Sequence, residues 1–251
     1  MPARRHTWTI VGASAAVLAL VATGFFAFAP TDDVAVPRDS APMDVWAPPA
    51  EAAPSASAPA GPGAADLVDP RWVQTTATAT GIPERALAAY AGVAIRKSLE
   101  MPACGLSWNT LAAIGATESG HGTHDGSILA ADGTATPPIY GIALVGGATD
   151  SIPDSDGGAI DGDAEWDRAV GPMQLIPETW RNWHVDANGD GVEDPQNIDD
   201  ATTATANYLC RASGDMATET GWSAGITAYN SDPAYIVKIA TAGSAYRADT
   251  R

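Results

Sequence analysis

An uncharged apolar stretch near the amino terminus is the feature that most constrains this chain. Residues 8–30 contain no Asp, Glu, Lys or Arg, and about 20 such residues are enough to cross a bilayer as a helix. Arg4 and Arg5 precede the stretch and acidic residues follow it, so residues 1–7 should be a cytoplasmic tail and everything downstream should be extracytoplasmic. Residues 8–30 are either a retained single-pass anchor or a signal peptide, because Ala27-Phe28-Ala29 offers a cleavage site and would then give a secreted protein.

The next segment, residues 31–66, is rich in proline, alanine and serine and holds seven of the 19 prolines. This composition offers little apolar surface to bury, so it predicts a disordered, extended linker. The folded domain is therefore expected to span residues 67–251.

The charge balance excludes one class of partner. Thirty acidic against 13 basic residues give a net charge of -17, and such a surface repels phosphate backbones. We expect no nucleic-acid partner, and we expect the domain to be a monomer.

The folded part reads as helices separated by long loops. Starts are indicated near Pro83, Ser107 and Pro177, and further starts by Asp199, Thr220 and Asp232-Pro233. Alternating β-branched runs of strand length are absent from the sequence. The predicted class is all-α or mostly α.

Cys104 and Cys210 are the only cysteines, and both lie in the part predicted to be extracytoplasmic. Disulfides persist in such compartments. We therefore expect them to be paired, with two free buried thiols as the alternative.

One glutamate has the properties of a general acid. Leu111, Ile114 and Glu118 follow the spacing of a single helix face, and Gly120 would end the helix just after Glu118. Burial and the negative end of the helix dipole both disfavour the charged form of the carboxyl and raise its pKa. A carboxyl kept protonated near neutral pH can donate a proton, although periodicity alone also allows a helix-end glutamate that turns to solvent.

Three short motifs occur in order, each at a predicted helix end or in a loop. They are Thr117-Glu118-Ser119-Gly120-His121-Gly122, Ala169-Val170-Gly171-Pro172-Met173-Gln174 and Ala228-Tyr229-Asn230. Together they resemble the signatures of lytic murein transglycosylases, most closely the membrane-bound B type, over about residues 70–246. The resemblance implies a lysozyme-like helical domain and peptidoglycan glycan strands as the partner.

The resemblance implies cleavage of the β-1,4 bond between N-acetylmuramic acid and N-acetylglucosamine, with Glu118 as the single acid and base. The substrate's 2-acetamido group would replace a second carboxylate, and the C6 hydroxyl would close a 1,6-anhydro ring. No cofactor is expected for catalysis.

The resemblance also implies roles for the other motif residues. Tyr229 would orient Glu118 or the acetamido group, and Asn230 would support that loop. Gln174 would hydrogen-bond the glycan and Met173 would line the subsite floor. Ser119 is a substrate-binding candidate, with a purely local backbone hydrogen bond as the alternative.

The loop at residues 186–197 has the pattern of a calcium site, with Asp186 as its position 1 and Asn197 as its position 12. Oxygen donors occupy its positions 1, 3, 5 and 9, a glycine occupies position 6, and position 7 can offer a carbonyl. Asn197 stands where a bidentate glutamate is expected, so the pattern predicts either weak binding or the use of Asp199 or Asp200 instead. The predicted structural calcium ligands are Asp186, Asn188, Asp190, Val192 and Asp194.

Three other functions are compatible with parts of the sequence. In a hydrolytic muramidase, Asp163, Asp167 or Glu178 would be a second carboxylate that activates water. A non-catalytic module would bind wall glycan without cutting it. His121 and His124 could suggest a zinc peptidase. The suggestion is weak, because the sequence lacks a helix with a glutamate between two histidines four residues apart.

Overall fold

Alpha-helices form most of the regular structure in the computed structural model, which describes residues 46–147 and 149–250. The predicted membrane segment at residues 8–30 lies outside the described residues, and within them no helix is long and apolar enough to cross a membrane. The elements are η1 (Ala65–Leu67), α1 (Pro70–Thr80), α2 (Glu84–Glu100), η2 (Pro102–Cys104), α3 (Trp108–Ser119), η3 (His124–Gly126), β1 (Ile128–Leu129), β2 (Ala135–Thr136), β3 (Tyr140–Ala143), β4 (Arg168–Val170), α4 (Pro177–Trp183), α5 (Ile198–Ser213), α6 (Glu219–Tyr229) and α7 (Pro233–Ala248).

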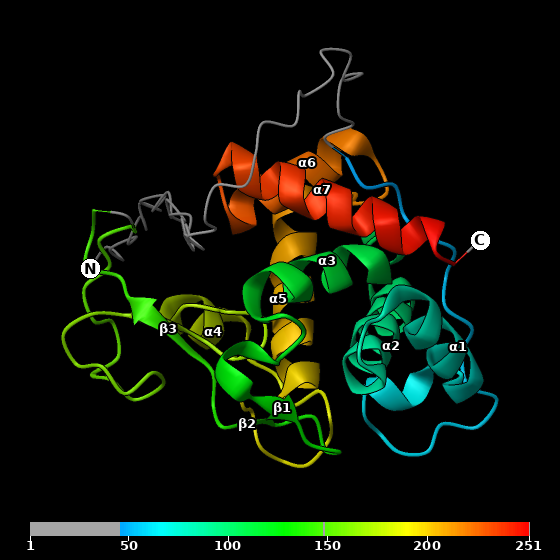
Figure 1. Ribbon diagram of the computed structural model, residues 1–251, viewed down its shortest axis with the longest axis horizontal. Coiled ribbons are helices and arrows are strands. Elements are labelled where there is room, and N and C mark those ends of the chain that lie inside the picture. Colours follow the sequence, from blue (N-terminus) through cyan, green and yellow to red (C-terminus); the bar gives the residue numbers. More distant parts are fainter. Residues whose placement is uncertain (1–45, 148, 251) are drawn as a thin grey trace, which may run out of the picture.

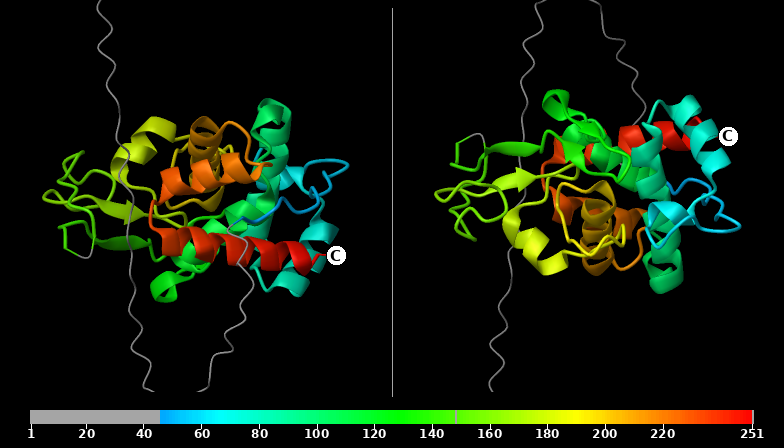
Figure 2. Two further views of the ribbon diagram at one scale, coloured as in Figure 1. Left: turned by 90° about the horizontal axis from the view of Figure 1, so that it is seen from above. Right: turned by 90° about the horizontal axis from the view of Figure 1, so that it is seen from below.

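Helix α5 is the centre of the domain. Every residue from Ile198 to Ala206 is buried, and a helix buried on all sides must be surrounded by other elements. In Figure 1, α1 and α2 lie to one side of α5, α6 and α7 lie above it, β3 lies on the opposite side, and β1 and β2 lie below. The views from above and below in Figure 2 agree with this arrangement.

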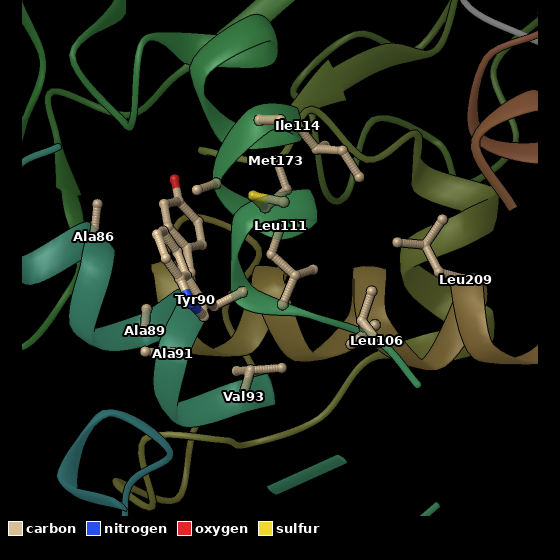
Figure 3. Packing of buried hydrophobic residues seen from close by; sticks show 14 of the residues in the cluster. Ala86, Ala89, Tyr90, Ala91, Val93, Leu106, Leu111, Ile114, Met173 and Leu209 are labelled. Atoms are coloured by element: carbon tan, nitrogen blue, oxygen red, sulfur yellow. The ribbon is translucent and has the colours of Figure 1, made fainter. Parts of the chain in front are cut away.

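The core is built where α2 packs against α3 and α5. Leu87 and Tyr90 of α2 and Leu111 and Ile114 of α3 are fully buried and belong to one hydrophobic cluster. Figure 3 shows Tyr90, Leu111 and Ile114 within it. Gly115 permits this approach, since a Cβ there would lie 2.0 Å from the Tyr90 hydroxyl. The packing fixes the last turn of α3.

The mostly α class is confirmed, with two small additions. Strands β1 and β2 pair antiparallel, and β3 and β4 form a second antiparallel pair. The strands are only two to four residues long, which is too short to leave an alternating pattern in a sequence.

Several helix starts differ from the prediction by a few residues. Helix α5 is capped by Asn197, whose side chain accepts from the Asp199 amide, and α6 is capped by Thr218 rather than Thr220. Asp232 caps α7 as expected. Asp199 cannot be a solvent-facing cap because its carboxylate pairs with Arg85 in the interior.

The predicted disulfide is present. Cys104 and Cys210 are bonded across 106 residues of sequence. The bridge joins the turn after α2 to the carboxyl-terminal half of α5, and so ties the amino-terminal helices to the central one.

The folded unit begins earlier than the predicted boundary at residue 67. Residues 46–66, which we call the strap, pack on the helices instead of forming a free linker, and Ala47, Ala50, Ala53 and Ala64 are buried. The buried Asn109 side chain accepts from the Ala50 amide at 3.0 Å and donates to the carbonyls of Pro48 and Gly243 at 3.0 and 2.9 Å. The composition misled the prediction because small residues pack closely and partners on the helices satisfy the strap's backbone groups.

Replacing Asn109 with alanine should release the strap. The change leaves the Ala50 amide and two carbonyls without their partner, so we expect a loss of about 2–4 kcal/mol in the free energy of unfolding, measured by urea denaturation. Asn182→Ala, at an exposed position of α4, is the control and should change stability by less than about 0.5 kcal/mol. Equal effects of the two variants would contradict the role of Asn109.

Candidate active site

Glu118 lies in the last turn of α3, where the sequence placed it. Leu111 and Ile114 are fully buried on the same helix and Glu118 is partly buried. Gly120 ends the helix in the left-handed conformation, with φ 59°, and its amide donates to the Ala116 carbonyl. Glu118 therefore sits at the edge of the core.

The surroundings of Glu118 raise the pKa of its carboxyl into the neutral range. Burial raises its pKa from the ordinary glutamate value of 4.5 to about 7, against the smaller opposing effects of a hydrogen bond from Tyr235 and the positive charge of Lys238. The Tyr235 hydroxyl donates to Glu118 Oε1 at 2.6 Å. Within the part of the chain that the structure describes, no second carboxylate is among the groups that shift this pKa.

Two stacked tyrosines adjoin the carboxyl. The rings of Tyr229 and Tyr235 lie 6.4 Å apart with an interplanar angle of 15°. The Tyr229 hydroxyl donates to the Met173 carbonyl, so the tyrosine that bonds Glu118 is Tyr235. Of the two roles predicted for Tyr229, orienting the acetamido group of the substrate stays a prediction. The spacing of Tyr235 and Ile239, both buried on α7, was the sequence signal that could have indicated an inward-facing tyrosine.

Ser119 joins two of the three motifs. Its side chain is buried, its hydroxyl donates to the Pro172 carbonyl at 2.6 Å, and its oxygen accepts from the Gly122 amide at 2.7 Å. With both partners inside the protein, Ser119 holds the end of α3 against the turn at residues 171–174.

That turn is built around close backbone contacts. Gly171 has φ 73°, and a Cβ there would lie 1.8 Å from the Pro195 carbonyl oxygen, so the position requires glycine. Met173 is fully buried in the core (Figure 3) and supports the turn from behind instead of presenting its side chain to a ligand. Gln174 is partly exposed, has φ 49°, and donates from Nε2 to the Gly171 carbonyl at 3.0 Å.

Asn230 stands between the last two helices. It is buried, ends α6, and accepts from the Asp232 amide at 2.9 Å. This contact fixes the short connection that sets α7, and with it Tyr235, against α3.

Part of this site matches a known family. Residues 158–243 match the family model of the transglycosylase SLT domain. The match supports a peptidoglycan transglycosylase in general terms. No curated protein and no solved structure gives a significant match.

The SLT match covers about a third of the chain and excludes Glu118. In the fold, α3, which carries Glu118, contacts the matched segment directly. The hydrogen bonds from Tyr235 to Glu118 and from Ser119 to Pro172 both cross from α3 into the matched segment. The Glu118 carboxyl therefore lies against residues of the segment that matches the SLT domain, although Glu118 itself is outside the match.

The histidines near Glu118 do not lie together. His121 is buried between Tyr90 and Tyr246, with ring nitrogen to hydroxyl distances of 3.3 and 3.1 Å, and burial lowers its pKa to about 4. His124 is exposed beside Asp125. Among the described residues, the one group with metal-ligand spacing contains neither histidine, which removes the geometric basis of a zinc peptidase.

The three candidates for a second carboxylate lie in or after the acidic segment between β3 and α4. Asp163 forms an ion pair with Arg168 at 2.8 Å. Asp167 is fully buried and accepts from the Ser155 amide and hydroxyl at 2.9 and 2.8 Å. Burial is the main cause that raises the Asp167 pKa. Glu178 lies in the first turn of α4.

The predicted calcium ligands form one tight turn. The Asp186 carboxylate accepts from the amides of Gly189 and Gly191 at 2.7 and 2.9 Å, and Asp190 accepts from the Val192 amide at 2.8 Å. The side chain of Asn188 donates to Asp190 Oδ2 at 2.9 Å.

Asp200 supports this turn from the interior. It is fully buried on α5 and accepts from the amides of Ala187 and Asp194 at 2.7 and 2.9 Å. Burial raises its pKa to about 6, opposed by those backbone hydrogen bonds. The turn is thereby attached to the central helix.

The titration of Glu118 should reveal its hydrogen bond to Tyr235. In protein labelled with 13C at glutamate carboxyls, the Glu118 signal, assigned with Glu118→Gln, should titrate with a midpoint near pH 7. Tyr235→Phe removes a donor that favours the charged form, so the midpoint should move to higher pH.

Tyr246→Phe is the matched control, because Tyr246 contacts His121 instead of Glu118. This variant should leave the Glu118 midpoint in place. A wild-type midpoint near 4.5, or an unchanged midpoint in Tyr235→Phe, would contradict the described environment.

Proposed function

We propose that this protein is a lytic transglycosylase that cleaves the β-1,4 bond between N-acetylmuramic acid and N-acetylglucosamine in peptidoglycan. The observation that carries the proposal is the partly buried Glu118 carboxyl, with a pKa of about 7, hydrogen-bonded by a tyrosine from the SLT-matched segment. Such a carboxyl is protonated in half of the molecules at neutral pH and can both give and take a proton.

In the first step, Glu118 gives its proton to the glycosidic oxygen and the bond from that oxygen to the anomeric carbon breaks. The positive charge that develops on the anomeric carbon is stabilised by the oxygen of the substrate's own 2-acetamido group. N-acetylglucosamine leaves as the free alcohol. Glu118 is now a carboxylate, and the Tyr235 hydroxyl stabilises it.

In the second step, the C6 hydroxyl of the same sugar attacks the anomeric carbon and passes its proton to Glu118. The product is a 1,6-anhydro ring, and the carboxyl returns to its starting state. The intramolecular hydroxyl competes well with water because it is already held beside the reacting carbon.

The other motif residues are assigned supporting roles. Gln174 is the candidate for hydrogen bonds to the glycan, since its amide is partly exposed beside the site. Tyr229 supports Tyr235 by stacking. Ser119, Met173 and Asn230 hold α3, the turn at residues 171–174 and α7 in register.

The proposal includes a location. The resemblance to the membrane-bound B type, the uncharged segment at residues 8–30 and the disulfide support an extracytoplasmic domain at the outer face of a membrane. A domain placed there can reach wall glycan.

The proposal also includes calcium in the turn that contains Asp186, Asn188 and Asp190. Carboxylate and amide oxygens are the donors that calcium prefers, and this turn gathers them while Asp200 holds its ends. Asp186, Asn188 and Asp190 would hold the ion by side-chain oxygens. Its contribution would be structural, fixing the connection between α4 and α5.

The products released from purified wall sacculi test the reaction. The wild-type protein should release muropeptides whose mass is one water lower than that of hydrolysis products, because an anhydro ring replaces the reducing end. Glu118→Gln should reduce release by at least about 1000-fold, since general acid catalysis contributes 10²–10⁴-fold and here one group acts in both steps.

Glu178→Gln is the control carboxylate and should retain near wild-type release. Products of full hydrolytic mass would identify a muramidase and overturn the proposed reaction. Binding to sacculi without any released fragment from the wild type would identify a non-catalytic glycan-binding module.

Thermal denaturation with and without calcium tests the metal proposal. Saturating calcium should raise Tm by several degrees relative to a chelated sample, since a ligand at 100 times its Kd stabilises the native state by about 2.7 kcal/mol. Asp186→Asn combined with Asp190→Asn should abolish the shift. A calcium-dependent shift that persists in this double variant would place the ion elsewhere.

A further inference from the structure

Among the residues that the structure describes, Lys238 is the positive charge that acts on the candidate catalytic carboxyl. It lies on α7 three residues after Tyr235, and residues at this spacing lie on the same side of a helix. Tyr235 bonds Glu118 directly at 2.6 Å, and the charge of Lys238 acts on Glu118 as well. The ammonium group therefore stands at the edge of the site.

The side chain of Lys238 is exposed, and among the described residues it takes part in none of the ion pairs or hydrogen bonds. Lys97, by contrast, is buried and paired with Glu100. Arg168 is committed to Asp163. An exposed cation without a partner beside a reaction centre is available to a ligand.

The overall charge makes this position more notable. The chain carries a net charge of -17, so most of its surface repels anions. An anionic group on the substrate would need a local positive charge in order to approach Glu118, and Lys238 supplies it.

The proposed substrate carries an anionic group at a suitable place. In N-acetylmuramic acid, a lactyl substituent at C3 lies on the same ring as the reacting anomeric carbon. Its carboxyl is free in glycan strands without peptides. In strands with peptide stems it is an amide, and the nearest carboxylates belong to the stem.

We propose that Lys238 binds a carboxylate attached through the C3 lactyl group of the reacting N-acetylmuramic acid. This inference rests on the proposed function. Lys238 is thus a substrate-binding residue that favours N-acetylmuramic acid over uncharged N-acetylglucosamine at the site of cleavage. Either source of the carboxylate, a free lactyl group or a peptide stem, offers the same ion-pair chemistry.

The test compares the full chain with its Lys238→Gln variant on three substrates at pH 5.5, where Glu118 is protonated in both. The substrates are peptide-free glycan strands, the same strands with lactyl carboxyls converted to methylamides, and strands with intact stems. On a carboxylate-bearing substrate, Lys238→Gln should lower kcat/KM about 5-fold by raising KM. This change corresponds to the upper range of the free energy that one exposed ion pair contributes. Lys238→Gln should have no effect on the methylamide strands.

The substrate arms identify the source of the carboxylate. A loss confined to peptide-free strands assigns the free lactyl group, and a loss confined to intact strands assigns the stem. Lys238→Arg should restore most of the lost kcat/KM. Arg71→Gln, an exposed cation on α1, is the matched control and should match the wild type.

Two results would overturn the inference. One is an equal loss on all three substrates, which a general electrostatic or structural effect of Lys238 would give. The other is no loss on any of them.

A binding measurement separates this inference from the proposed reaction. In the Glu118→Gln background, peptide-free strands should bind more tightly than their methylamide form, and Lys238→Gln should abolish the difference. If the wild-type protein cut no glycan, the proposed reaction would fail while this comparison still decided the role of Lys238.

Discussion

The hydrogen bond between Glu118 and Tyr235 is the interaction on which the candidate site depends. The two residues are 117 positions apart in the chain, and they meet only because α3 and α7 pack side by side. The contact completes the environment of a carboxyl that burial has already shifted toward the protonated form. Any change that separates α3 from α7 would expose the carboxyl to water and return its pKa toward that of an ordinary glutamate.

The same packing explains why the site has few independent parts. Ser119 follows Glu118 directly and holds the turn at residues 171–174 through Pro172. That turn receives the Tyr229 hydroxyl at Met173, and Tyr229 stacks on Tyr235. The contacts form a closed ring that returns to Glu118, so each motif is positioned by the other two. In this arrangement a buried residue such as Met173 affects the site through backbone geometry.

Short sequence patterns predicted the helix face that carries Glu118, one helix cap and the disulfide. The helix face at Leu111, Ile114 and Glu118, the cap at Asp232 and the disulfide follow from spacing, capping chemistry and compartment, and the structure agrees with them. Tyr235 could not be assigned as the partner of Glu118, because the packing of two distant helices decides that contact. The short strands were missed for lack of length. The strap was misread because an Ala- and Pro-rich segment becomes ordered when a side chain such as Asn109 satisfies its backbone.

The position of the strap has a mechanical consequence. The strap is held by Asn109, which lies in the first turn of α3, the helix that carries Glu118 in its last turn. Arg247 near the end of α7 adds a second fastening at the Pro49 carbonyl. A force transmitted along the upstream chain would load these two fastenings at the far ends of α3 and α7. The hydrogen bonds around the carboxyl, at the other end of α3, are thereby separated from tension applied to the strap.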